Sequence, residues 1–144
     1  MIAYFDTSAL IALLIEEPVT ARAGRIWDAA EHVSSVRLIY TEARAALAQA
    51  TRMGRLASED LATAIDALGG LYDQLDLLEI DDTLMRHAGD LAQRHELRGY
   101  DAIHLAAAER VASDTSILVA GDRDLCTAAG QLGMAVASTI RDEE

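Results

Sequence analysis

The chain alternates between short unbroken apolar runs and longer runs in which apolar residues recur three or four positions apart. The unbroken runs predict strands, and the recurring positions predict amphipathic helices because they fall on one helix face. We expect strands at 2–5, 32–36, 77–80, 117–120 and 134–137, and helices at about 6–14, 18–30, 39–54, 58–75, 82–96, 101–112 and 122–131. Strands that alternate with helices predict a mainly parallel sheet of four to five strands, with helices on both faces.

Two adjacent glycines interrupt the helix expected at 58–75. Inside a helix, Gly69 and Gly70 each cost about 1 kcal/mol relative to alanine. Such a pair indicates a kink or a close contact with another helix.

The length of 144 residues suits one domain with a sizeable core, which we expect to span 1–140, with 141–144 as a flexible tail. No apolar run approaches the roughly 20 residues needed to span a bilayer. The first residues, MIAYFD, lack the basic region of a secretory signal. Cys126 is the single cysteine, which excludes an internal disulfide and a CxxC zinc site and favours the reducing cytoplasm.

The charge balance is strongly acidic, with 24 Asp and Glu against 12 basic residues and a net charge of −12. All the basic residues are arginine. Acidity of this kind keeps a protein in solution, and it repels nucleic acid because most nucleic-acid affinity comes from cations that meet phosphates. A nucleic-acid ligand would therefore need local positive charge, from a bound metal or from clustered arginine.

Four acidic residues stand out by position. Asp6 and Asp122 each follow a predicted strand and begin a helix, and Asp101 opens the helix of GYDAIHLAAAER. Helix capping explains each of these three singly, because Asp is a preferred N-cap residue. Glu42 lies inside a helix at the border of its apolar face, where it either enters a site or curves out to solvent.

The four acids together suggest more than capping. The carboxyl ends of parallel strands share one edge of a sheet, so Asp6 and Asp122 should emerge there side by side. If the helices that carry Glu42 and Asp101 pack over that edge, four carboxylates share one pocket. Like charges at one site raise each other's pKa, and Mg²⁺ or Mn²⁺ relieves the repulsion through oxygen ligands. This arrangement predicts metal-assisted hydrolysis of phosphodiester bonds, and the metal would also attract phosphate to an acidic protein.

Four segments carry a resemblance to a known family: FDTSAL at 5–10, YTEARAAL at 40–47, YDAIHLAAA at 100–108 and GDRDL at 121–125. Over essentially its whole length the chain resembles a PIN domain, and more narrowly a VapC-type toxin of a bacterial type II toxin–antitoxin pair. The resemblance implies a three-layer αβα sandwich and an endoribonuclease that depends on Mg²⁺ or Mn²⁺.

The resemblance also implies site residues and partners. The catalytic and metal-binding acids would be Asp6, Glu42, Asp101 and Asp122. Ser8 matches a hydroxyl position that helps to orient the first Asp. Family members often have Thr or Ser two residues before the fourth acid, where this chain has Ala120, so Asp124 is an alternative to Asp122. The implied partners are RNA, a small VapB-type antitoxin whose basic segment enters the acidic pocket, and a second copy of the chain.

Several other functions fit less well. Phosphatases and response regulators need a second acid or a phosphate-binding lysine, but position 8 is Ser and the chain has no lysine. A Rossmann nucleotide binder needs a glycine-rich first turn, which DTSAL lacks. Two alternatives remain: a nuclease that acts on single-stranded or flap DNA, and a catalytically silent binding module. His104, three residues after Asp101, either orients a ligand or, as such residues more commonly do, packs beside the core.

Overall fold

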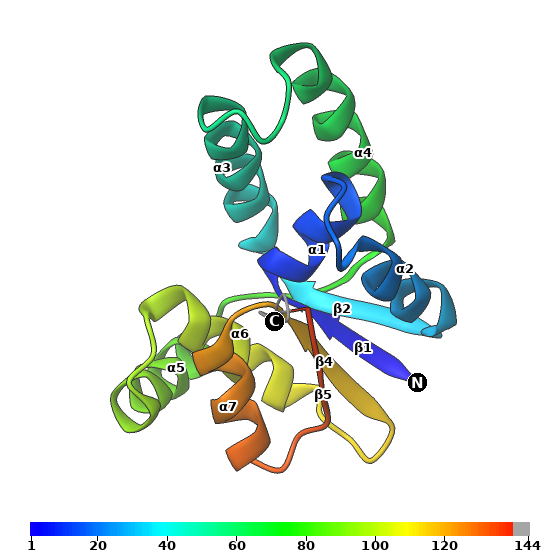
Figure 1. Cartoon of the computed structure of the whole chain (residues 1–144). Helices are drawn as coiled ribbons and strands as arrows, with labels where there is room; N and C mark the ends of the chain where they lie inside the picture. The colour runs from blue at the N-terminus through cyan, green and yellow to red at the C-terminus, as the bar shows by residue number, and fades with distance from the viewer. Residues whose placement is uncertain (140–144) are drawn as a thin grey trace.

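Five short strands form one sheet in the order β3–β2–β1–β4–β5 in the computed structural model, which describes residues 1–139 (Figure 1). The strands are β1 (Ile2–Phe5), β2 (His32–Val36), β3 (Asp76–Leu78), β4 (Ser116–Ala120) and β5 (Val136–Ser138). All neighbouring strands in this sheet pair in parallel. Their carboxyl ends therefore lie at one edge, as the alternation of strands and helices predicts. The expected tail at 141–144 lies outside the described residues.

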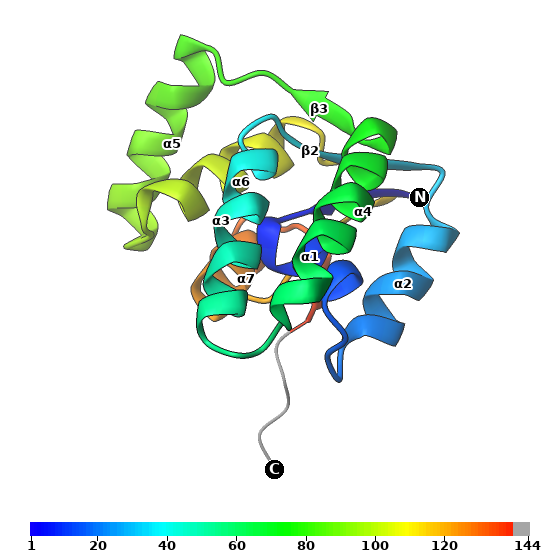
Figure 2. The same ribbon diagram turned by 90° about the horizontal axis from the view of Figure 1, so that it is seen from above.

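Helices cover both faces of the sheet. One face carries α1 (Thr7–Leu14), α2 (Thr20–Ala29), α3 (Ile39–Arg52) and α4 (Leu61–Gln74), with a short 3-10 turn, η1 (Ser58–Asp60), before α4. The other face carries α5 (Asp82–His95), α6 (Gly99–Arg110) and α7 (Arg123–Gln131). Figure 1 shows the two groups on opposite sides of the sheet, and Figure 2 looks from above onto α1, α3 and α4. The predicted three-layer αβα sandwich is confirmed. No helix within residues 1–139 is long and apolar enough to cross a membrane.

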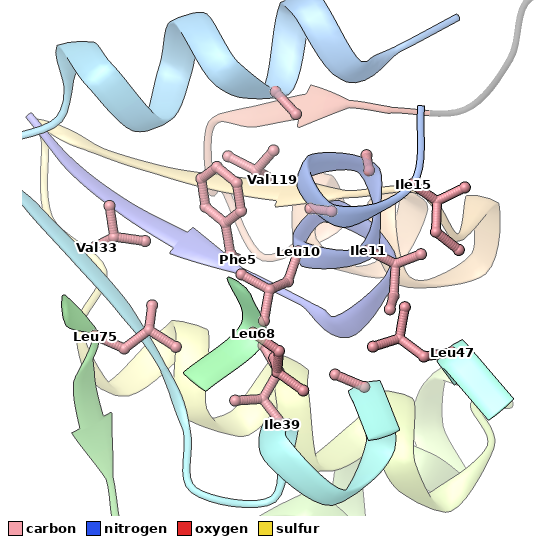
Figure 3. Close-up of a cluster of buried hydrophobic side chains, with 14 of the residues drawn as sticks. Phe5, Leu10, Ile11, Ile15, Val33, Ile39, Leu47, Leu68, Leu75 and Val119 are labelled. Atoms are coloured by element: carbon pink, nitrogen blue, oxygen red, sulfur yellow. The ribbon is translucent and has the colours of Figure 1, made fainter. Parts of the chain in front are cut away.

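Strand side chains alternate between two apolar cores, because successive residues of a strand point to opposite faces. Phe5 and Val119 join the core under α1 to α4 (Figure 3), whereas Tyr4 and Leu118 join the core under α5 to α7. Fully buried leucine and isoleucine side chains fill both cores: Leu10, Ile39, Leu47 and Leu68 in the first, and Leu84, Leu91, Leu105 and Leu125 in the second. Each such side chain contributes about 1.5–3 kcal/mol of burial free energy.

The helix α6 is buried on nearly all sides. Its residues 102–108 are all buried, because α5, α7 and the sheet surround it. A helix that is apolar around its whole circumference is expected in such a place. The acidic residue Asp101, near the start of α6, therefore belongs to one of the best-packed helices of the molecule.

Several bounds differ from the expected elements, among them the start of α2 at Thr20 and the limits of two strands. The third strand is Asp76–Leu78 and not 77–80, because its neighbour β2 ends at Val36, which pairs with Leu78. The fifth strand is Val136–Ser138 and not 134–137, because its pairing with β4 begins at Leu118, opposite Val136.

Of the two explanations for Gly69 and Gly70, a kink or a close helix contact, the close contact is wrong. Helix α4 runs without a break from Leu61 to Gln74. A Cβ atom built on either glycine would meet nothing within 4 Å. Neither glycine is therefore required by the packing of a neighbouring helix.

The strand order reverses at β1, which has β2 on one side and β4 on the other. Open α/β sheets bind ligands at such a point, because the connections leave the adjacent strands in opposite directions and open a crevice. Asp6 follows β1, and Asp122 lies two residues after β4. The two acids therefore flank the place where a ligand is expected.

Candidate active site

Asp6 is a buried carboxylate at the junction of β1 and α1. It caps α1 by accepting a hydrogen bond from Ala9 N at 2.9 Å, and Ser8 Oγ donates to its two oxygens at 2.8 and 3.0 Å. Its side chain is almost excluded from solvent, and this desolvation raises the pKa of Asp6 to about 6. The charge of His104 and the hydrogen bonds from Ala9 and Ser8 oppose the shift, while Asp101 adds to it. The surrounding groups therefore compensate the negative charge of ionised Asp6 only in part.

Ser8 connects this carboxylate to the turn after β4. Its Oγ accepts a hydrogen bond from Gly121 N at 2.8 Å while it donates to Asp6. A Cβ atom on Gly121 would lie 2.9 Å from both Ser8 Oγ and Thr139 Oγ1, which is too close for carbon. Glycine at position 121 therefore permits the close approach that links the Asp6 and Asp122 segments.

Asp122 caps α7, and Leu125 N donates to its Oδ1 at 2.9 Å. Asp101 is different. Helix α6 begins at Gly99 with Arg98 at the N-cap position, so Asp101 lies within the first turn. The capping explanation of Asp101 is therefore wrong, because the helix starts before the position that the sequence suggests.

Arg98 bridges two of the acids. Its Nε donates to Asp101 Oδ2 at 2.9 Å, and its Nη2 donates to Asp122 Oδ2 at 3.0 Å. Desolvation raises the pKa of Asp101, an effect that Arg98 opposes and Asp122 reinforces. Sequence reasoning missed Arg98. Its position three residues before Asp101 is the signal that could have suggested the first contact, because residues three apart are neighbours on a helix surface.

The side chain of Glu42 points inward because it contacts His104. The Nε2 atom of His104 lies 2.8 Å from Glu42 Oε1 and 3.2 Å from Thr7 Oγ1, and Nδ1 lies 2.8 Å from the Tyr4 hydroxyl. His104 is 1% exposed. Desolvation lowers the pKa of His104, but the hydrogen bond and charge of Glu42, with Asp6 and Asp101, outweigh it and raise the pKa. The interpretation of His104 as a residue packed beside the core describes its burial and misses its hold on Glu42.

The predicted acids share one open cavity of about 820 Å³ between α1, α3, α6 and the turn after β4. Its lining includes Asp6, Ser8, Glu42, Asp101 and Asp122, together with Arg52, Arg98 and His104. Asp124 is exposed on α7 and is absent from this lining. Geometry therefore favours Asp122 over Asp124 as the fourth acid of the cavity.

The donor set suits a hard cation, although the acids are not drawn tightly together. Within residues 1–139, no three His, Cys, Asp or Glu side chains are grouped closely enough to hold a metal ion among them. Mg²⁺ usually binds one or two carboxylates and completes its octahedral shell with water and phosphate oxygens. Carboxylates spaced around a wide cavity suit this mode of Mg²⁺ binding. A cation would also balance the charge of Asp6, which its neighbours compensate only in part.

Comparison with known proteins places this geometry in a family. Residues 3–131 match the family described as the PIN domain. Ribonuclease VapC49 of Mycobacterium tuberculosis (strain ATCC 25618 / H37Rv) is 39% identical over 139 residues, with 96% of each chain covered. PAE2754 from Pyrobaculum aerophilum has a TM-score of 0.69 at 26% identity, covering 94% of this chain and 92% of that one. A chain of a toxin–antitoxin complex from Klebsiella pneumoniae shares the fold, with a TM-score of 0.65 at 20% identity and coverage of 94% and 96%. The chain belongs to the PIN domain family, as one of its VapC-type members.

Proposed function

We propose that the protein is a metal-dependent endoribonuclease that hydrolyses RNA phosphodiester bonds and serves as the toxin of a toxin–antitoxin pair. One observation carries the proposal: Asp6, Glu42, Asp101 and Asp122, spread over the chain, line a single cavity at the carboxyl edge of the sheet. The 39% identity to a ribonuclease along almost the whole chain favours RNA as the substrate.

Mg²⁺ or Mn²⁺ is the cofactor that these ligands suit, with Asp6 and Asp101 as its principal carboxylates and Glu42 and Asp122 around them. When bound, such an ion lowers the pKa of a coordinated water and offsets charge on the phosphate. The chain's own residues prepare the site. Ser8 orients Asp6 through a hydroxyl hydrogen shared between the two carboxylate oxygens, and buried His104 keeps Glu42 turned inward.

The charge of the chain supports one proposed partner, the antitoxin. With a net charge of −12, the surface favours a basic partner segment, as expected of a VapB-type antitoxin that blocks the cavity. The cavity already accommodates one guanidinium group, that of Arg98, between two acids. We further propose a homodimer that acts in the cytoplasm, where a single unpaired cysteine is stable.

A cleavage assay tests the function. Purified protein is incubated with structured RNA, single-stranded DNA and flap DNA, each with Mg²⁺, Mn²⁺ or EDTA. We expect cleavage of RNA with either metal and none with EDTA. Cleavage of DNA in preference to RNA would reject the proposed substrate. If the protein cleaves none of them with either metal but still binds a basic antitoxin peptide, the result would favour a catalytically silent binding module.

A further inference from the structure

We infer that Arg98 is an exchangeable internal cation of the active site: it bridges Asp101 and Asp122 before metal arrives, yields this position to the divalent ion, and then binds a phosphate of the RNA. The inference rests on the proposed function and adds to it a residue for substrate binding.

The geometry places the guanidinium between two acids of different elements. Asp101 comes from the first turn of α6, and Asp122 comes from the N-cap of α7, so no single helix sets their spacing. Arg98 uses one donor for each, at 2.9 and 3.0 Å. Two carboxylates that share a cavity repel each other, and the positive charge of Arg98 between them offsets that repulsion.

The two halves of the cavity are held in different ways. Asp6 is fixed by the buried backbone of Ala9 and by Ser8, and Glu42 is fixed by buried His104. Asp101 pairs with Arg98, whose side chain is 78% exposed, and the same guanidinium pairs with Asp122 Oδ2, while Asp122 Oδ1 accepts from Leu125 N. Ion pairs so open to water are weak, because solvent screens the attraction and the arginine must give up its rotational freedom. A divalent ion can therefore take the place of Arg98, whereas the bond from the buried Ala9 backbone to Asp6 and the contact of buried His104 with Glu42 stay in place.

Once displaced by the metal ion, Arg98 is positioned to bind a phosphate of the RNA. Among residues 1–139, Arg52 and Arg98 are the arginines that line the cavity, in a chain whose net charge repels nucleic acid. A guanidinium presents a planar fork of donors that matches phosphate oxygens. At the start of α6 the freed group stays beside the metal position, where an RNA phosphate would approach.

A purely structural role for Arg98 predicts the opposite effect on metal. If Arg98 serves to hold Asp101 and Asp122 in register for the ion, its removal loosens the ligands and weakens metal binding. If Arg98 competes for the same oxygens, its removal strengthens metal binding. The sign of the change separates the two roles.

The experiment compares Arg98→Gln with Arg110→Gln in the full chain. Arg110 also pairs with one aspartate, Asp81, through two contacts at 3.2 and 3.3 Å, and it lies outside the cavity lining, so both variants lose one positive charge and an ion pair. Mn²⁺ affinity is measured by calorimetry without RNA. Binding of a phosphorothioate RNA oligonucleotide is measured separately at saturating Mn²⁺. Thermal melting checks that each variant is folded.

We expect Arg98→Gln to bind Mn²⁺ about tenfold more tightly and RNA about tenfold more weakly, and Arg110→Gln to stay within about twofold on both measures. Metal affinity that falls or does not change in Arg98→Gln overturns the exchange, and unchanged RNA affinity overturns the phosphate contact. Either result can occur while the wild-type protein still cleaves RNA with Mn²⁺, which would leave the proposed function standing. If neither the wild-type protein nor Arg98→Gln binds Mn²⁺, the inference and the metal-dependent function are both overturned.

Discussion

His104 on α6 lies 2.8 Å from Glu42 on α3, so a buried imidazole joins the two helices that face each other across the cavity. The other ring nitrogen lies 2.8 Å from the hydroxyl of Tyr4, a residue of β1. One histidine therefore connects an acid of the site to both the central strand and the best-buried helix. An acid at the border of a helix is free to point toward solvent, and this contact is what turns Glu42 inward.

Replacing His104 with Phe should lower both stability and activity. The buried Tyr4 hydroxyl loses its bond to the imidazole, which costs on the order of 1 kcal/mol, and Glu42 is released from its position. Chemical denaturation measures the first effect and RNA cleavage with Mn²⁺ the second. Tyr4→Phe serves as the control, because it removes the same hydroxyl contact and keeps the hold on Glu42. Equal cleavage by the two variants at equal stability would contradict the role assigned to His104.

Asp101→Asn should abolish cleavage and leave the free energy of unfolding within about 1 kcal/mol of wild type. Asn keeps the shape, position 101 is not the N-cap of α6, and the lost ion pair with Arg98 is largely exposed. Gel assays with Mg²⁺ report cleavage, and urea titration reports stability. Asp124→Asn, an exposed acid outside the cavity lining, is the matched control and should cleave normally. Normal cleavage by Asp101→Asn would remove Asp101 from the site.

The part of the site that follows strands could be predicted from the sequence, and the part that depends on helix packing could not. Asp6 comes directly after one apolar strand and Asp122 two residues after another, so a parallel sheet brings them to one edge. The partners of Glu42 and Asp122 lie 62 and 24 positions away in the sequence, in His104 and Arg98. No local periodicity reports such pairs, because they depend on how α6 is oriented against α3 and α7.

The fold shows the same division. Alternating strands and helices predict the parallel sheet and its two helical layers, because these patterns are local. The limits of β3 depend on where β2 stops, and the freedom of Gly69 depends on what neighbours α4, so both lie beyond a local pattern. Because α6 starts at Gly99, Asp101 lies in its first turn, where it pairs with Arg98 and does not cap the helix.

The stability of the metal-free protein should fall as pH rises from about 4 to about 6, as far as Asp6 contributes to it. Burial raises the pKa of Asp6 from 3.8 to about 6, so the folded state holds a proton that the unfolded state has lost in this range. A shift of about two pKa units corresponds to on the order of 3 kcal/mol, present below the lower pKa and lost above the higher one.

Asp6→Asn should remove this dependence. In EDTA at neutral pH the variant should be more stable than wild type by about 1–3 kcal/mol, because Asn also accepts the capping bond from Ala9 and carries no buried charge. Mn²⁺ should stabilise the wild-type protein increasingly as pH rises through about 6, since the ion needs the deprotonated carboxylate, and should not stabilise the variant. Denaturation curves across pH, with EDTA or Mn²⁺, check both statements. Greater stability of the wild type in EDTA at neutral pH would contradict the assigned burial cost.

Gly121→Ala should destabilise the fold and weaken the site, because its Cβ would lie 2.9 Å from Ser8 Oγ and from Thr139 Oγ1. Ser8 can move away only by giving up its bonds to Asp6 and to the backbone of Gly121, so we expect a loss of about 1–3 kcal/mol. Without the Ser8 bond the pKa of Asp6 rises further, and Mn²⁺ binding should move to higher pH. Gly70→Ala is the control. It lies in α4 with nothing within 4 Å of its Cβ, and it should stabilise the protein by about 0.5–1 kcal/mol, as alanine does in a helix. If Gly121→Ala is as stable as Gly70→Ala and binds Mn²⁺ with the wild-type pH profile, then Ser8 does not couple the turn after β4 to Asp6.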